Sequence, residues 1–303
     1  MTCAADAAVS GGEATGETDR EAVSATNDRY TRKRCVLVTG CSSGIGRETA
    51  RAFLAEDWLV VATARDPETV TDLEEAGCET APLDVTQPAA VTAAVERAVD
   101  VGGAVDCVVN SAGYAQYGPL EDISTRSLHR QFDVNVYGPH RLTRAALPHM
   151  RANGSGRIVN VSSFMGRLSF AGAGAYSGSK HALEAMSDAL RAEVEPFGID
   201  VVLVEPGPVE TAFARRADEE LPGERTADYE DLYDLYEDAR LLGGDGPLTL
   251  EPDAVAAAIV QASTCSDPPA RIPVGPVSQY GSLLRFVPDR VRDAASGLLR
   301  RLA

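Results

Sequence analysis

Short apolar runs alternate with segments of helical periodicity over most of the chain. An apolar run of about four to eight residues followed by turn residues is typical of a strand buried on both faces. Regular alternation of such runs with helical segments predicts an α/β fold, in which helices cover both faces of one parallel sheet. Strands are predicted at 35–39, 58–63, 78–83, 106–109, 157–161, 199–204 and 270–274, and helices at 47–56, 67–76, 88–101, 124–150 (which admits a break at Gly138-Pro139), from just before Tyr176 to about Pro196, and at 252–262.

Small or polar residues follow the predicted strands at the point where each one ends. In open parallel sheets, ligands bind beyond the carboxyl ends of the strands. The convergence of these residues predicts a single site at that edge of the sheet. It comprises residues 40–46, Arg65, Asp84, Asn110, Ser163 and Pro206-Gly207.

A glycine-rich turn joins the first predicted strand to the first helix. Glycines at such a place let backbone N–H groups and the helix N-terminus approach a pyrophosphate. The alternative is a plain tight turn, but the strand before it and the helix after it favour a phosphate cradle. The predicted members of the cradle are Gly40, Ser42, Ser43, Gly44, Ile45 and Gly46.

The end of the second predicted strand indicates which dinucleotide the cradle holds. NAD sites usually carry an acid roughly 20 residues past the glycine turn, which binds the ribose 2′-hydroxyl. Here Arg65 stands nearest that position, and its guanidinium suits a 2′-phosphate, to which Ser43 adds a hydroxyl donor. The sequence therefore favours NADP(H). The competing interpretation gives the ribose to Asp66 and predicts NAD(H).

Three further polar positions have both a structural and a functional interpretation. Asp84 either contacts an adenine edge or caps the following turn or helix. Asn110, with Ala112 and Gly113 after it, suits close approach of a ligand to the backbone. Asn135 lies in an apolar stretch of a predicted helix, and either bonds the neighbouring turn or forms a polar bulge near the catalytic centre.

Tyr176 and Lys180 stand four residues apart at the start of a helical pattern, and so lie on one helix face. An ammonium beside a phenol favours the phenolate, which moves the Tyr pKa from about 10 toward neutrality and allows proton exchange near working pH. The alternative is a chance pair on a solvated face. That alternative is disfavoured because the chain has nine tyrosines and only two lysines, Lys33 and Lys180.

Net charge bears on the surroundings and the partners of the chain. The formal charge is −17 at pH 7, and 26 of the 28 basic residues are arginine. This acidic, lysine-poor composition resembles that of halophilic proteins in a salt-rich cytosol, and the alternative is a protein that is merely acidic. Either way it argues against nucleic acid as a partner, because phosphates require a basic patch.

Neither cysteine nor histidine forms a metal motif. The six cysteines are scattered, and the four histidines show no paired spacing. We therefore predict no metal site, and thiols kept free in a reducing cytosol. No stretch reaches the length of a membrane-spanning helix, and the N-terminus lacks the apolar core of a signal peptide, so we expect a cytoplasmic protein.

The chain divides into three parts. Residues 1–33 have no sustained apolar period and are predicted to be a disordered acidic tail, or an extension from a start codon assigned too far upstream. Residues 34–276 form a single domain. Residues 277–303 form an amphipathic helical segment with five arginines, which we expect to cover the pocket or a neighbouring subunit; lying on an anionic membrane is the alternative.

These motifs together resemble the short-chain dehydrogenase/reductase family over about residues 34–276. The family pattern of T-G-x-x-x-G-x-G, N-x-A-G, a helix Asn, a Ser thirteen residues before a Tyr, Y-x-x-x-K and P-G is present in that order. The glycine turn, Arg65 and the run P-G-P-V-E-T-A-F look most like the NADP-using hydroxysteroid, retinol and carbonyl reductases. The pattern is carried by residues 39–46, 110–113, Asn135, Ser163, Tyr176, Lys180, Pro206 and Gly207.

The resemblance implies a Rossmann-type, doubly wound sheet of seven parallel strands in the order 3-2-1-4-5-6-7, and a proton relay. In that relay Tyr176 donates a proton to a substrate carbonyl, Lys180 lowers the Tyr pKa and holds the nicotinamide ribose, and Ser163 binds the substrate oxygen. Asn135 holds a water that links Lys180 to solvent. The implied cofactor contacts also include Val85, Pro206 and Gly207, with Val209 and Thr211 on the nicotinamide carboxamide.

The resemblance also implies a substrate lid at 212–246, a segment that contains Tyr229, Tyr233 and Tyr236; a solvated helical pair packed on its own aromatics is the alternative. The implied activity is NADP-dependent interconversion of a ketone or aldehyde with an alcohol, on a small apolar substrate, by a homodimer or homotetramer. Two other functions stay open. One is a dinucleotide-sensing binding protein without turnover, and the other is a sugar-nucleotide epimerase or dehydratase.

Overall fold

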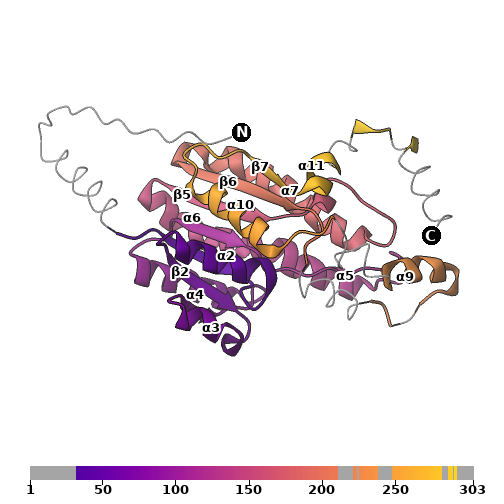
Figure 1. Cartoon of the computed structure of the whole chain (residues 1–303), viewed down its shortest axis with the longest axis horizontal. Helices are drawn as coiled ribbons and strands as arrows, with labels where there is room; N and C mark the ends of the chain where they lie inside the picture. The colour runs from indigo at the N-terminus through magenta and orange to yellow at the C-terminus, as the bar shows by residue number, and fades with distance from the viewer. Residues whose placement is uncertain are drawn as a thin grey trace, which may run out of the picture.

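The computed structural model describes residues 32–210, 221–223, 225–237, 248–281, 286–288 and 290–291. In these ranges one sheet of seven parallel strands runs in the order β3-β2-β1-β4-β5-β6-β7 (Figure 1). The predicted doubly wound fold is confirmed. The strands are β1 (Cys35–Thr39), β2 (Leu59–Ala64), β3 (Glu79–Pro82), β4 (Cys107–Asn110), β5 (Gly156–Val161), β6 (Ile199–Pro206) and β7 (Arg271–Val274).

Helices connect the successive strands and cover the sheet on both faces (Figure 1). None of the helices in the described ranges is long and apolar enough to cross a membrane. The helical elements are α2 (Gly44–Ala55), η1 (Pro67–Val70), α3 (Thr71–Glu75), α4 (Pro88–Gly102), α5 (Thr125–Phe132), η2 (Asp133–Tyr137), α6 (Gly138–Asn153), η3 (Phe164–Gly166), α7 (Gly174–Val194), η4 (Glu195–Phe197), η5 (Ala227–Tyr229), α9 (Glu230–Glu237), α10 (Pro252–Thr264) and α11 (Pro276–Gly281).

Two apolar layers, one on each face of the sheet, make up most of the core. Along β1, Val36 and Val38 belong to one layer and Leu37 to the other, because successive side chains of a strand point to opposite faces. The first layer is completed by α2 and α10, and the second by α4 and α6. Burial on both faces explains why the strands appear in the sequence as continuous apolar runs.

The predicted helix at 124–150 is three elements rather than one. α5 ends at Phe132, a π-helical turn (η2) follows, and α6 begins at Gly138. Pro139 lies in the first turn of α6, where its missing N–H costs nothing. A Cβ at Gly138 would lie 2.8 Å from Cγ2 of Val85, so only glycine allows this approach. The break allowed at Gly138-Pro139 is confirmed, whereas the π-helical turn before it was not predicted.

Four of the cysteines, Cys35, Cys41, Cys78 and Cys107, are buried free thiols. Burial raises the pKa of Cys41 and of Cys107 to about 12, which keeps these thiols protonated. The prediction of free thiols is correct for these four and wrong for Cys265, which is disulfide-bonded.

The three segments predicted around the central domain lie largely outside the described residues. This applies to the tail at 1–33, to the C-terminal segment at 277–303 and to much of the lid at 212–246. Within residues 212–246 the structure describes η5 and α9.

Phe53 anchors the first core layer, because it is fully buried and meets Trp58 edge to face with ring centroids 5.0 Å apart. We predict that Phe53→Ala lowers the free energy of unfolding by about 3–5 kcal/mol, since truncation also leaves a cavity. Urea unfolding followed by circular dichroism measures this. Phe197→Ala removes the same ring from an exposed site and should cost less than about 1 kcal/mol; equal losses for the two variants would contradict the prediction.

Candidate active site

A cavity of about 660 Å³ opens at the carboxyl edge of the sheet, where the sequence predicts the site. Asn110 and Asn135 do not line it, and Thr211 lies outside the described residues. The other predicted site residues all do: Gly40, Ser42, Ser43, Gly44, Ile45, Gly46, Arg65, Asp84, Val85, Ala112, Gly113, Ser163, Tyr176, Lys180, Pro206, Gly207 and Val209.

The glycine turn has the shape of a phosphate cradle. Gly40 and Gly44 have φ angles of +77° and +56°, a conformation that residues with a Cβ rarely adopt. A Cβ at Gly46 would lie 2.4 Å from the carbonyl oxygen of Gly40, so the helix approaches the turn as closely as glycine permits. Ser43 precedes α2 without a side-chain capping bond, and the first turn of α2 has no acidic residue. The N–H groups of that turn are therefore available to phosphate oxygens, and the turn fits a dinucleotide pyrophosphate.

Two residues that we did not assign to the site hold its loops in place. The Arg47 guanidinium donates to the carbonyl oxygen of Ser42 (3.1 Å) and pairs with Asp72 (3.0 Å), which fixes the turn against α3. The Thr39 hydroxyl accepts bonds from the backbone N–H groups of residues 111 and 112, each at 3.0 Å. Thr39 opens the glycine motif, and that position is the signal in the sequence that points to it.

Arg65 and Asp66 face different surroundings at the end of β2. The exposed side chain of Arg65 lines the cavity. Asp66 does not line it, and its carboxylate instead caps η1 by accepting a bond from the N–H of Glu68 (3.1 Å). Asp84 lines the cavity and accepts bonds from the N–H (2.9 Å) and hydroxyl (2.8 Å) of Thr86, so it caps the following turn as one interpretation expects; its contact with an adenine edge stays a prediction.

Ser163, Tyr176 and Lys180 meet in the inner part of the cavity, and each is almost fully buried. The Ser163 hydroxyl hydrogen-bonds the Tyr176 hydroxyl and accepts a bond from the N–H of Met165 (3.1 Å), which fixes its direction. Lys180 Nζ donates to the carbonyl oxygen of Val161 (2.8 Å) and lies 5.8 Å from the centre of the Tyr176 ring. The end of β5 and the first turns of α7 thus build one polar group.

The expected acidification of Tyr176 is wrong for this arrangement. Burial raises the pKa of Tyr176 to about 12, and its bond to Ser163 offsets this only in part. Burial also lowers the pKa of Lys180 to about 8, against the opposite effect of the Glu184 carboxylate. Burial is the larger effect for both groups, and it disfavours the charged form of each. Tyr176 is therefore a phenol at neutral pH, ready to donate a proton.

Asn135 and Asn110 do not line the cavity, but their hydrogen bonds join elements that surround it. Asn135 lies in the π-helical turn η2, where its amide bonds the N–H and C=O of Tyr114 (3.2 and 2.9 Å) and the hydroxyl of Ser179 (3.1 Å). It thus bonds a neighbouring loop from a helix bulge, as the structural interpretation expects, and its role at the catalytic centre stays a prediction. Asn110 donates to the side chain of Asn160 (2.7 Å), which ties β4 to β5.

An apolar wall lies beside the polar group. It is formed by Ala115, Tyr117, Met165, Ala173, Leu232 and the ring of Tyr176 itself. Leu232 belongs to α9, so the described part of the predicted lid packs on this wall. Hydrogen bonds fix this part of the segment there, because the Tyr233 hydroxyl and the Thr226 hydroxyl each donate to the Asp122 carboxylate at 2.6 Å.

Comparison with known proteins agrees with this geometry. A family model described as short chain dehydrogenase matches residues 34–222, more than half of the chain. The chain belongs to the short-chain dehydrogenase family. The matched range contains the glycine turn, the buried polar group and Pro206-Gly207.

Relatives of this short-chain dehydrogenase extend the similarity beyond the matched range. Uncharacterized oxidoreductase YbbO of Escherichia coli (strain K12) is 36% identical, over 86% of this chain and 93% of the relative. The NADPH-dependent 3-dehydrocapnine reductase of Ornithobacterium rhinotracheale is 33% identical, over 86% and 95%. A solved structure of a short-chain dehydrogenase from Streptomyces avermitilis is 37% identical with a TM-score of 0.74, and covers 88% of this chain and 95% of that one.

Family membership and these relatives make the protein an oxidoreductase that acts on CH–OH groups with NAD or NADP. The donors around the cavity suit such a cofactor: backbone N–H groups at the cradle for the pyrophosphate, and an ammonium and hydroxyls further in. In the described part of the chain, no three His, Cys, Asp or Glu side chains are grouped to hold a metal ion.

Gly46→Ala tests the cradle of this short-chain dehydrogenase. The added Cβ must displace the Gly40 carbonyl, so we predict a loss of NAD(P)(H) affinity of about tenfold or more, measured by isothermal titration calorimetry. Gly178→Ala makes the same change in α7, where the nearest atom to the new Cβ is 4.0 Å away, and should leave the affinity unchanged. Full affinity in Gly46→Ala would mean that the close approach is not needed.

Proposed function

We propose that the protein is an NADP(H)-dependent oxidoreductase that interconverts an apolar ketone or aldehyde with the corresponding alcohol. The observation that carries this proposal is the buried group of Ser163, Tyr176 and Lys180, which shares one cavity with the phosphate cradle and Arg65 and lies beside an apolar wall.

Each residue of the buried group has a separate role in the reaction at the substrate oxygen. Tyr176, a phenol at neutral pH, donates its proton to a carbonyl oxygen, or accepts one from an alcohol in the reverse direction. Ser163 donates a hydrogen bond to the same oxygen and stabilises the charge that develops there. Lys180 holds the ribose hydroxyls and returns a proton to Tyr176, and Asn135 holds the loop beside it. A bound nicotinamide supplies or accepts the hydride.

Arg65 supports the choice of NADP(H) over NAD(H). Its guanidinium lies at the cavity, whereas Asp66, the acid that the NAD interpretation needs, caps η1 and does not line the cavity. A guanidinium binds a phosphate through strong charge-assisted hydrogen bonds. A relative with 33% identity is named as NADPH-dependent, which agrees with this choice.

The apolar wall supports an apolar substrate beside Tyr176. Tyr117 meets the Tyr176 ring edge-on at 6.0 Å, and Leu232 of α9 packs against the same cluster. We propose that 212–246 is the lid over this substrate, and that its contact with Asp122 sets the closed position. A lid that buries an apolar ligand also excludes water from the reacting carbonyl.

The remaining expectations belong to the same proposal. The charge of −17 supports function in a salt-rich cytosol. We also propose that the protein forms a homodimer or homotetramer. Light scattering in concentrated potassium chloride measures this.

Tyr176→Phe tests the proton donor. We predict that it lowers kcat for NADPH-dependent reduction of apolar carbonyls by about 10²–10⁴-fold, because it removes the hydroxyl that protonates the oxygen. Lys180→Ala should have a comparable effect, and the two losses should not add. Tyr280→Phe, at an exposed site, is the control. Near-normal turnover in Tyr176→Phe would overturn the mechanism, and NADPH binding without turnover on any carbonyl would favour a dinucleotide sensor.

Arg65→Glu tests the cofactor. We predict a loss of NADPH affinity of about 10–100-fold with no loss of NADH affinity, since the variant removes a charged bond to the 2′-phosphate and adds repulsion. Fluorescence titration with both nucleotides measures this. Arg144→Glu makes the same charge change on the exposed surface of α6 and should change neither affinity. Unchanged NADPH affinity in Arg65→Glu would remove the basis for NADP(H).

A further inference from the structure

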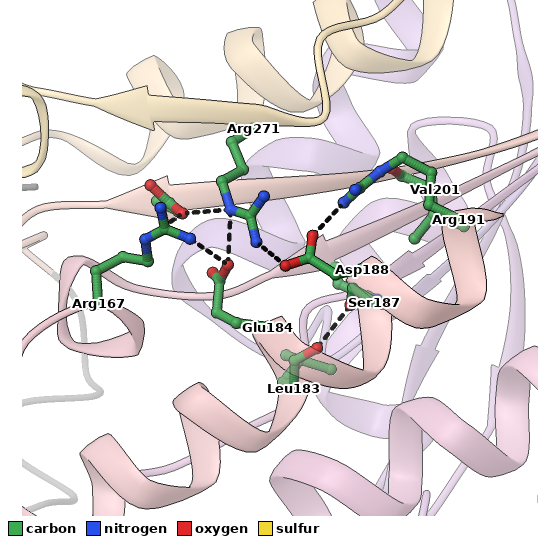
Figure 2. A network of polar contacts seen from close by, with 10 residues as sticks. Arg167, Leu183, Glu184, Ser187, Asp188, Arg191, Val201 and Arg271 are labelled. Carbon is green, nitrogen blue, oxygen red and sulfur yellow. Dashed lines mark hydrogen bonds and ion pairs between the residues drawn. The ribbon is translucent and has the colours of Figure 1, made fainter.

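A group of charged side chains surrounds Glu184, one helical turn beyond Lys180 on α7, and we call it the Glu184 cluster (Figure 2). Glu184 accepts a bond from Nε of Arg271 at 3.0 Å, and Asp188, one turn further, accepts one from the same guanidinium at 2.6 Å. Figure 2 shows both carboxylates pointing from α7 toward Arg271, while Arg167 reaches Glu184 from another segment. The members of the cluster are Arg167, Glu184, Asp188, Glu205 and Arg271.

The cluster joins the segments that form the inner cavity. Arg167 follows η3, four residues after Ser163, and its guanidinium lies 3.7 Å from Glu184 and 3.9 Å from Glu205. Glu205 directly precedes Pro206-Gly207 and lies 3.3 Å from Arg271 at the start of β7. The loop that carries Ser163, the loop after β6 and the helix that carries Lys180 are therefore fixed to one set of charges.

Glu184 and Glu205 form a buried pair of carboxyl groups that requires a proton. Their side chains are 5% and 3% exposed, and both approach Nε of Arg271, at 3.0 and 3.3 Å, so burial and mutual repulsion disfavour a charge on both at once. Oε1 of each receives no hydrogen bond from the described residues. Burial raises the pKa of Glu205 to about 7. We assign the proton to Glu205, since Glu184 has the closer contact with Arg271 and stays a carboxylate.

We propose that Glu184 is a positioning residue whose carboxylate keeps Lys180 an ammonium and whose ion pairs hold the loop of Ser163 and the loop of Pro206-Gly207 beside it. Its effect on turnover rests on the proposed function, whereas its effect on the charge of Lys180 does not. Glu184 follows Lys180 by four residues and so lies on the same helix face.

Among the described residues, Glu184 is the anion whose charge acts on Lys180. The titratable groups facing Lys180 are Tyr176 and Glu184, with Glu205, Arg167 and Arg271 behind the latter. Val161 supplies only a neutral carbonyl oxygen. Burial lowers the pKa of Lys180 to about 8, and the Glu184 carboxylate opposes this fall. Without that carboxylate a large share of Lys180 would be neutral near pH 7.

Titration of lysine tests the proposal directly, because the chain has only two lysines. In protein that carries isotopically labelled lysine and Lys33→Arg, the only lysine signal in the NMR spectrum is that of Lys180, and its dependence on pH gives the pKa without turnover. We expect Glu184→Gln to lower the pKa of Lys180 by about one pH unit, since the amide has no charge to favour the ammonium. The alkaline limb of the kcat profile should move to lower pH to the same extent.

Two variants separate this role from general disruption of the cluster. Asp188→Asn removes another ion pair of Arg271 but lies two turns from Lys180, and should leave the pKa of Lys180 unchanged. Glu205→Gln keeps a neutral side chain beside Glu184, and Lys180 should titrate no lower than in the wild type. If the cluster has only a structural role, Glu184→Gln and Glu205→Gln should change the pKa of Lys180 in the same way.

An unchanged pKa of Lys180 in Glu184→Gln overturns the proposal. If circular dichroism shows that Glu184→Gln does not fold, the test is the pKa of Lys180 in Glu205→Gln. A pKa below the wild-type value overturns the proposal, and a pKa equal to or above it supports the proposal. Wild-type protein without turnover on any carbonyl, in which Lys180 nevertheless titrates as expected, would overturn the proposed function and support the assignment of Glu184.

Discussion

Burial of the Lys180 ammonium is the constraint on which the arrangement of the site depends. A cation taken out of water needs compensating partners, or it loses its proton. The end of β5 supplies the Val161 carbonyl oxygen, and α7 supplies the Glu184 carboxylate one turn away. Neither element can move without disturbing that charge. The register of α7 against the sheet is therefore set by chemistry as well as by apolar packing.

The site also solves an electrostatic problem that the composition creates. A chain with a formal charge of −17 binds an anionic dinucleotide. Local groups make this feasible: the uncapped N-terminus of α2, Arg65 and Lys180 all face the cavity, and no acid lies in the first turn of α2. Charges in contact with a ligand are screened by salt far less than distant surface charges. High ionic strength thus weakens the repulsion from the surface more than the attraction within the cavity.

The sequence predicts the parts of this structure that depend on local pattern. The apolar run at 35–39 marks β1 because both faces of the strand are buried, and the glycine turn is recognisable because Gly40 and Gly44 have positive φ. What it does not predict depends on contacts between distant residues. The pairing of Asn110 with Asn160 and the bonds from Asn135 to Tyr114 join separate elements. The spacing of Tyr176 and Lys180 places them on one face but does not reveal how far burial shifts their pKa values. Glu184 fits the pattern of a solvated helix face and is instead buried.

The ion pairs between the site and β7 affect how activity is lost on heating. β7 is a four-residue strand at the edge of the sheet, none of its residues is fully buried, and it carries Arg271. Edge elements with few buried contacts open locally at a lower free energy than the central strands. Detachment of β7 would withdraw Arg271 from Glu184 and Glu205 while the six other strands stay paired. Activity is then lost by a local and reversible opening, at a temperature below that at which the core unfolds.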